Sequence, residues 1–106
     1  MATTTSKTLT KGTLTHALTA PEDGYLMAEL NGSNLTGIVD VRFQHSVSGN
    51  NWETISDQND KEVVIRLDGK KNASVTRVKL LEPFRAENLR AVITSDSTGS
   101  LQFVIQ

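Results

Sequence analysis

The sequence has no cysteine among its 106 residues, so disulfide bonds and thiolate chemistry are both excluded. Because small extracellular eukaryotic domains are often rich in disulfides, this absence favours a protein assembled in a reducing cytoplasm. The formal net charge is only −1, which does not support a general basic surface for nucleic acid. No run approaches the roughly 18 apolar residues of a membrane helix, and residues 1–7 lack the apolar core of a signal peptide. We therefore expect neither a membrane nor a nucleic acid as partner.

What the sequence has instead is a period-two alternation of apolar and polar residues. It is clearest in 38–44, where Val39, Val41 and Phe43 share one face and Asp40, Arg42 and Gln44 share the other. Successive side chains of a strand leave opposite faces of a sheet, so this pattern predicts a half-buried antiparallel strand. The same alternation returns near the end of the chain in Leu101, Phe103 and Ile105.

Turn residues divide the chain into short strands. We expect strands near 7–11, 13–19, 25–30, 37–46, 52–55, 62–67, 74–80, 88–94 and 101–105, and residues 84–88 are compatible with a short helical turn. Strands 37–46 and 52–55 should form a hairpin, Asp68-Gly69 has the chemistry of a hairpin turn, and Pro83 should end the seventh strand. In 25–30 the alternation allows either Leu26, Ala28 and Leu30 or Tyr25 and Met27 to face inward.

This spacing predicts an all-β protein with one antiparallel β-sandwich domain, jelly-roll-like, with an immunoglobulin-like sandwich as the alternative. The domain should cover residues 7–106. Threonine is concentrated in residues 3–19, and its branched side chain favours extended backbone. We therefore expect residues 1–6 to form an extended N-terminal arm, with a flexible tail as the alternative for the threonine-rich start.

Few residues are candidates for chemistry. His16 and His45 show no spacing that pairs them as metal ligands, and the oxygen-rich stretch 57–60 lacks the glycine and glutamate of a calcium loop. Asp40, His45, Ser46 and Ser48 could be arranged as parts of a hydrolase, but neighbouring strand residues point to opposite faces. We expect no enzyme activity, no metal and no cofactor.

Aromatic residues offer the remaining candidate sites. Trp52 is the only tryptophan and is expected to fill the core, although Trp52 or Tyr25 could stack on a sugar ring instead. Phe84, Arg85 and Arg90 could form a basic-aromatic patch, but in a near-neutral chain a solvated sheet face is the preferred interpretation.

One segment carries a resemblance. Residues 41–55 read as a strand, then Ser46-Val47-Ser48-Gly49-Asn50-Asn51-Trp52, then a strand, which resembles the pattern S-x-(D/S)-G-x-x-W of small β-sandwich proteins of tailed bacteriophages. Carbohydrate-binding and discoidin-like sandwiches show it too. Residues 84–93 and the turn at 97–99 also fit, whereas Ser48 stands where many such sequences carry aspartate.

The phage resemblance implies a non-enzymatic structural protein of the virion, most specifically a capsid decoration protein, assembled in the host cytoplasm. Its expected partners are the major capsid protein or other virion proteins, and it is expected to form a homo-oligomer. The arm would add a strand to a neighbour's sheet through Thr3, Thr4, Thr5, Lys7 and Thr8. The alternatives are a carbohydrate-binding module and a tail or head-completion protein.

Overall fold

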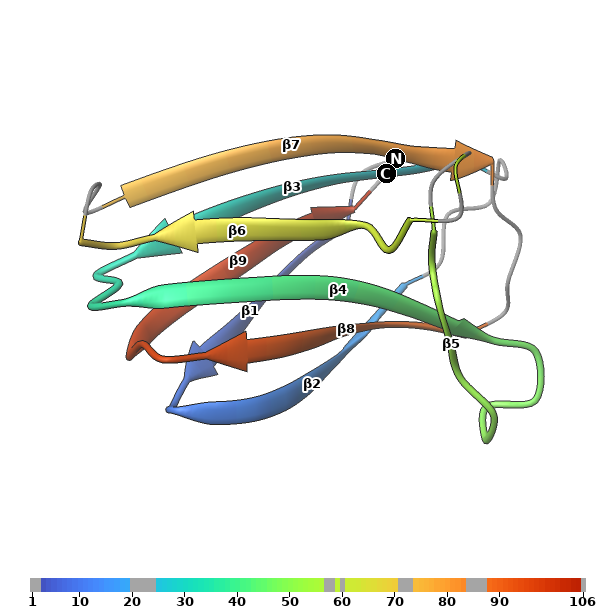
Figure 1. Cartoon of the computed structure of the whole chain (residues 1–106), viewed down its shortest axis with the longest axis horizontal. Coiled ribbons are helices and arrows are strands. Elements are labelled where there is room, and N and C mark those ends of the chain that lie inside the picture. The colour runs from blue at the N-terminus through green and yellow to red at the C-terminus, as the bar shows by residue number, and fades with distance from the viewer. Residues whose placement is uncertain are drawn as a thin grey trace.

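The computed structural model describes residues 3–19, 25–56, 59, 61–70, 74–83 and 88–105, with side chains for all of these except 25–26 and 74–83. Within these ranges the chain forms nine strands and no helix (Figure 1). The strands are β1 (Thr3–Leu9), β2 (Gly12–Leu18), β3 (Tyr25–Ser33), β4 (Ile38–Ser46), β5 (Glu53–Thr54), β6 (Val64–Asp68), β7 (Ser74–Pro83), β8 (Asn88–Ser95) and β9 (Gly99–Ile105). The described residues accordingly include no helix long and apolar enough to cross a lipid bilayer.

The strands form two packed antiparallel sheets (Figure 1). Sheet A has the order β1-β9-β3-β7, and sheet B has the order β2-β8-β4. Two short strands share the far side of β4: β6 pairs with its first half and β5 with its last residues. The described ends of the chain lie side by side, because Thr3 pairs with Ile105.

The pairing is nested from the ends of the chain toward its middle. Leaving aside the two-residue β5, β1 pairs with β9, β2 with β8, β3 with β7, and β4 with β6. A ribbon paired in this way and wrapped into two sheets is a jelly roll. The predicted all-β sandwich of jelly-roll type is therefore confirmed.

The core lies between the inner faces of the two sheets, where the alternation predicted it. Val39, Val41 and Phe43 are fully buried on β4, and so are Leu101 and Phe103 on β9. Each such side chain contributes about 1.5–3 kcal/mol by leaving water. On β3 the structure decides between the two possible faces, since the buried residues are Ala28 and Leu30 whereas Met27 is exposed.

Three expectations about strand ends and connections are wrong. The first strand spans Thr3–Leu9, so Thr3–Ser6 belong to the sandwich and form no separate arm. The Asp68-Gly69 turn does not close a hairpin, because β6 lies in sheet B and β7 in sheet A. Strand β7 runs past the expected end at Leu80 and ends at Pro83, a residue that its position at the edge of sheet A tolerates. Of the expected helical turn, residues 84–87 lie outside the described part and Asn88 begins β8.

At one end of the sandwich a buried serine ties two connections together. The turn between β3 and β4 meets the turn between β8 and β9, and Ser97 is fully buried where they meet. Its hydroxyl accepts hydrogen bonds from the amides of Thr36 (2.8 Å) and Gly37 (3.2 Å) and donates one to the carbonyl of Thr98 (2.7 Å). This hydroxyl therefore ties the β3–β4 crossing between the sheets to the β8–β9 crossing.

Candidate functional site

Sheet A presents to solvent a surface of short, uncharged polar side chains, which we call the polar face. It consists of Thr4, Ser6 and Thr8 of β1, Ser100 and Gln102 of β9, and Asn31 and Ser33 of β3. At the Thr4 end the same side of sheet A continues with Val104, Glu29 and the exposed Met27. The pairing registers align two rows across the three strands, Ser6–Gln102–Asn31 and Thr8–Ser100–Ser33. In the first row the Asn31 amide donates to Oε1 of Gln102 at 3.2 Å.

The five residues predicted to bind a partner do not share one surface. Thr4 and Thr8 are exposed on the polar face, whereas Thr3, Thr5 and Lys7 have the opposite parity and are half-buried on the side toward sheet B. All five pair with β9 of their own chain. These residues are therefore part of this chain's own sheet, and a neighbour's strand could pair only with the second side of β1, which no described strand occupies.

His16 occupies the side of the sandwich where β1 and β2 lie. Its Nε2 is 2.9 Å from the Thr5 hydroxyl, and its ring stacks on Phe103 with 5.1 Å between the ring centroids. Burial, and secondarily the positive charge of Lys7, lower the pKa of His16 below its ordinary value. The imidazole thus joins the two sheets in its neutral form. No group of three or more metal-ligating side chains gathers within the described residues.

Trp52 lies on the outer face of sheet B, and the expectation that it fills the core is wrong. It is half-buried, and the guanidinium carbon of Arg90 lies 4.1 Å from the centroid of its ring. Arg90 also donates from Nε to Oε1 of Gln44 at 2.8 Å, and Gln44 donates to the Thr54 hydroxyl at 3.4 Å. We call Gln44, Trp52, Thr54 and Arg90 the Trp52 cluster.

The parity of the strands could have indicated this cluster. The alternation correctly predicted that Gln44 lies on the outer face. Its partner in β5, Thr54, shares that face because paired residues lie on the same side of a sheet. Trp52 is two residues before Thr54, so the same alternation places it there too. Sequence reasoning instead grouped Arg90 with Phe84 and Arg85, which lie outside the described residues, as does the side chain of Tyr25.

The remaining outer face of sheet B carries two ion pairs on β4, beside the exposed apolar residues Ile38 and Val64. Arg66 binds Asp40 through two hydrogen bonds of 2.7 and 3.0 Å, and Arg42 lies 3.1 Å from Glu62. The hydrogen bond from Arg66 is the main cause that lowers the pKa of Asp40. Asp40 and Arg66 pair across the neighbouring strands β4 and β6, and Arg42 of β4 pairs with Glu62 just before β6.

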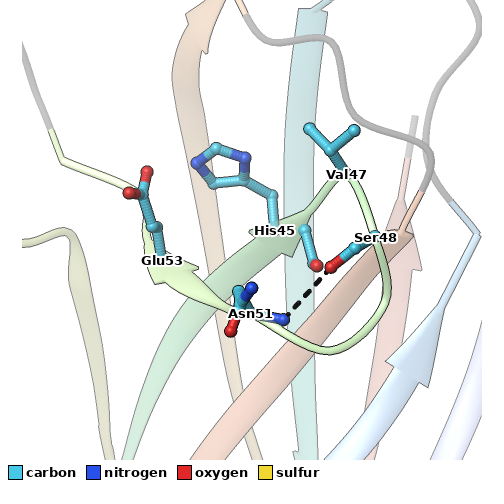
Figure 2. Close-up of a pocket in the computed structure, with 6 residues that line it drawn as sticks. His45, Val47, Ser48, Asn51 and Glu53 are labelled. Atoms are coloured by element: carbon cyan, nitrogen blue, oxygen red, sulfur yellow. Dashed lines mark hydrogen bonds between the residues drawn. The ribbon is translucent and has the colours of Figure 1, made fainter.

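A pocket of about 370 Å³ lies at the β4–β5 hairpin (Figure 2). His45 and Glu53 are paired positions of the two strands and lie on the same side of the hairpin. Ser46 accepts the amide of Gly49 at 2.8 Å, and Ser48 accepts those of Asn50 and Asn51 at 3.1 and 3.3 Å. Both hydroxyls therefore hold the turn.

The other residues considered for a hydrolase do not converge on this pocket. The carboxylate of Asp40 is bound to Arg66 on the outer face of sheet B. Asn88 donates to the carbonyl of Ser46 at 3.1 Å and so fixes the start of the turn to β8. The geometry is that of a braced hairpin whose pocket is lined by one imidazole and one carboxylate.

Comparison with known proteins adds no relative to this description. No protein-family model, no curated protein and no solved structure matches the chain.

Proposed function

We propose that the protein is a structural component of a bacteriophage particle, of the capsid decoration type, which binds between capsid subunits and stabilises the head. The observation that carries the proposal is the polar face, which is exposed and formed by regular strands. Two arguments support it: jelly rolls occur in viral capsid proteins, which is an analogy of fold alone, and residues 41–55 resemble phage β-sandwich proteins.

The chemistry of the polar face suits docking against another protein. The centres of protein interfaces are depleted in charged residues. Strands β1 and β9 present none on this face, and Glu29 of β3 lies at its end, in the row of Thr4 and Val104. Serine and threonine lose little rotamer freedom when they are buried, so their immobilisation costs little. The contact residues are then Thr4, Ser6 and Thr8 as part of a sheet surface, and the partner is the major capsid protein or another virion protein.

The test uses particles of the phage that encodes this chain. Mass spectrometry of purified particles should find the chain at a fixed ratio to the major capsid protein. Purified chain should then co-sediment with heads from which it has been removed. Ser6→Lys places a charge on the β1 side of the polar face and should weaken this binding by about tenfold or more, because an unpaired ammonium would be buried.

The matched control is Thr94→Lys, which adds the same charge at an exposed position of sheet B. It should bind as the unmodified chain does. Equal binding by both variants would exclude the polar face as the contact. Absence of the chain from particles would refute the proposal, and its presence in tails alone would replace it by the tail-protein alternative.

A carbohydrate-binding module is the second candidate, because the Trp52 cluster is on the outer face of sheet B and combines an aromatic ring with polar side chains. Jelly rolls also occur in lectins, and aromatic rings stack on sugars. Titration with oligosaccharides should then change the fluorescence of Trp52, and Trp52→Ala should abolish binding. An emission spectrum unchanged by every sugar favours the structural role.

A further inference from the structure

Of the strands at the edges of the two sheets, β2 is the one without protection. Exposed edges are usually guarded by charges, proline, bulges or short length, because their free backbone groups can pair with another chain. Strand β1 carries the inward-turned Lys7. The sequence of β7 contains Arg77, Lys79 and Pro83, and its pairing with β3 is interrupted by a register shift. Strand β6 has only five residues and carries Arg66.

Strand β2 has none of these devices. Its seven residues contain no proline and no lysine, arginine, aspartate or glutamate. It pairs with β8 without interruption from Gly12 to Leu18, and no other described strand pairs with its second side. On its inner face Leu14 and Leu18 are only half-buried where they pack against the core. A strand added here would complete both the ladder and the burial of these leucines.

The sequence of β2 indicates which strand fits. Leu14-Thr15-His16-Ala17-Leu18 has the same order of residue classes in both directions, with His16 at the centre. Antiparallel pairing of two copies about His16 therefore sets Leu14 against Leu18 of the second copy, and Thr15 against Ala17. Leucine would meet leucine on the inner face, and small side chains would meet on the outer face. No like-charged carboxylate, ammonium or guanidinium groups oppose each other.

We propose that the β2 edge is a self-association site, at which two copies of this chain pair antiparallel about His16 and join their B sheets into one continuous sheet. Such an interface is isologous, since the same strand serves in both copies. Its specificity comes from the leucine pairs and its affinity from the added backbone ladder. The proposal does not depend on the function proposed above.

The first test is the mass of the full-length chain by sedimentation equilibrium over a concentration series. We expect a reversible monomer–dimer equilibrium. Thr15→Lys/Ala17→Lys places lysines opposite each other across the two-fold axis, at exposed positions that the monomer tolerates, and should weaken the dimer by about tenfold. The control Thr4→Lys/Thr8→Lys adds the same charge to exposed positions of another edge strand, β1, and should leave the dimer intact.

The second test reads the register directly. Because the chain has no cysteine, a Thr15→Cys variant mixed with an Ala17→Cys variant reports only on the introduced thiols. Facing residues of antiparallel strands have Cα atoms about 4.5–5.5 Å apart, within disulfide reach. Under mild oxidation the mixed dimer should form faster than either homodimer and faster than a dimer of Thr94→Cys, which lies on the interior strand β8.

Three results would overturn the proposal. They are a strictly monomeric chain at every concentration, a dimer lost in the β1 double variant but kept in the β2 double variant, and a Thr15→Cys homodimer that forms faster than the mixed one. Far-ultraviolet circular dichroism of each variant verifies that the sandwich is intact. Failure of head binding with a normal dimer would affect only the proposed function.

Discussion

Replacing Ser97 by alanine is the most informative test of how the two sheets are held together. The residue is fully buried, and its hydroxyl makes three hydrogen bonds of 2.7–3.2 Å, to the amides of Thr36 and Gly37 and to the carbonyl of Thr98, besides a longer one of 3.5 Å with the Thr36 hydroxyl. A hydroxyl has one donor and two acceptor positions, so all of its capacity is used. Alanine fits the space and removes every one of these bonds.

The expected cost follows from what is left unpaired. The Gly37 amide is buried, and a buried donor without an acceptor costs about 1–3 kcal/mol. Thr36 is exposed, so water can replace its lost bond and the loss is about 0.5–1.5 kcal/mol. The free energy of unfolding should therefore fall by about 1.5–4.5 kcal/mol, a large fraction of the roughly 5–15 kcal/mol of a typical domain. Each kcal/mol lowers the Tm of a domain of this size by about 4–8 °C.

The measurement is urea unfolding followed by the fluorescence of the single tryptophan and by circular dichroism. Ser100→Ala is the matched control, because Ser100 is exposed on the polar face and its loss should change stability by at most about 0.5 kcal/mol. Hydrogen exchange should show a faster Gly37 amide in Ser97→Ala only. If Ser97→Ala and Ser100→Ala were equally stable, or if exchange at Gly37 were unchanged, the assigned role of the buried hydroxyl would be wrong.

Three further predictions concern strain, pH and the aromatic cluster. Gly99 and Gly12 both have positive φ (115° and 123°), but a Cβ at Gly99 would stand 2.6 and 2.7 Å from two backbone carbonyl oxygens, whereas one at Gly12 would meet nothing within 4 Å. Thermal unfolding should therefore show Gly99→Ala to be less stable than Gly12→Ala by at least about 1 kcal/mol, and the reverse order would contradict the geometry. The lowered pKa of His16 means that the unfolded chain takes up this proton first, so stability should fall as pH drops below the ordinary value of 6.5 and level off below the folded-state pKa. In His16→Gln the urea midpoint should no longer show this decrease when the pH is lowered. If the variant showed the same decrease, other titrating groups would be its cause. Arg90→Ala should uncover the ring of Trp52, shifting its emission to longer wavelength and increasing its quenching by acrylamide, with Arg90→Lys intermediate; identical spectra would show that the stacking does not shield the ring.

The elements and faces of the fold were predictable wherever they depend on local geometry. The alternation assigned Val39, Val41 and Phe43 to the core, and they are completely buried. It failed to choose a face for β3, because apolar residues occupy both parities there and only contact with sheet B decides. It also missed the first residues of β1, since a run of threonines and one serine shows no apolar alternation and is revealed as a strand only by its pairing with β9.

The candidate sites were less predictable, because they join residues far apart in the chain. The size of Trp52 predicted a place in the core. Its ring instead lies on the outer face of sheet B, the face of Gln44 and Thr54, where it contacts Arg90. The turn at Asp68-Gly69 has hairpin chemistry, with the Asp68 carboxylate accepting the amide of Lys70 at 3.0 Å. That local bond is compatible with either a hairpin or a crossing between sheets, so it could not decide which one forms.

The sequence by itself determined that the chain is a sandwich of short antiparallel strands, free of disulfides, with an inner and an outer face on most strands. It could do so because side-chain alternation is a property of the pleated backbone and needs no knowledge of neighbours. Only the tertiary structure decided that β2 is an unguarded edge, that Thr4 and Thr8 belong to the polar face, and that Ser97 is buried. Those properties come from pairings between distant residues, such as Ser97 with Thr36 across 61 positions, and they arise when the nested ribbon wraps into two sheets.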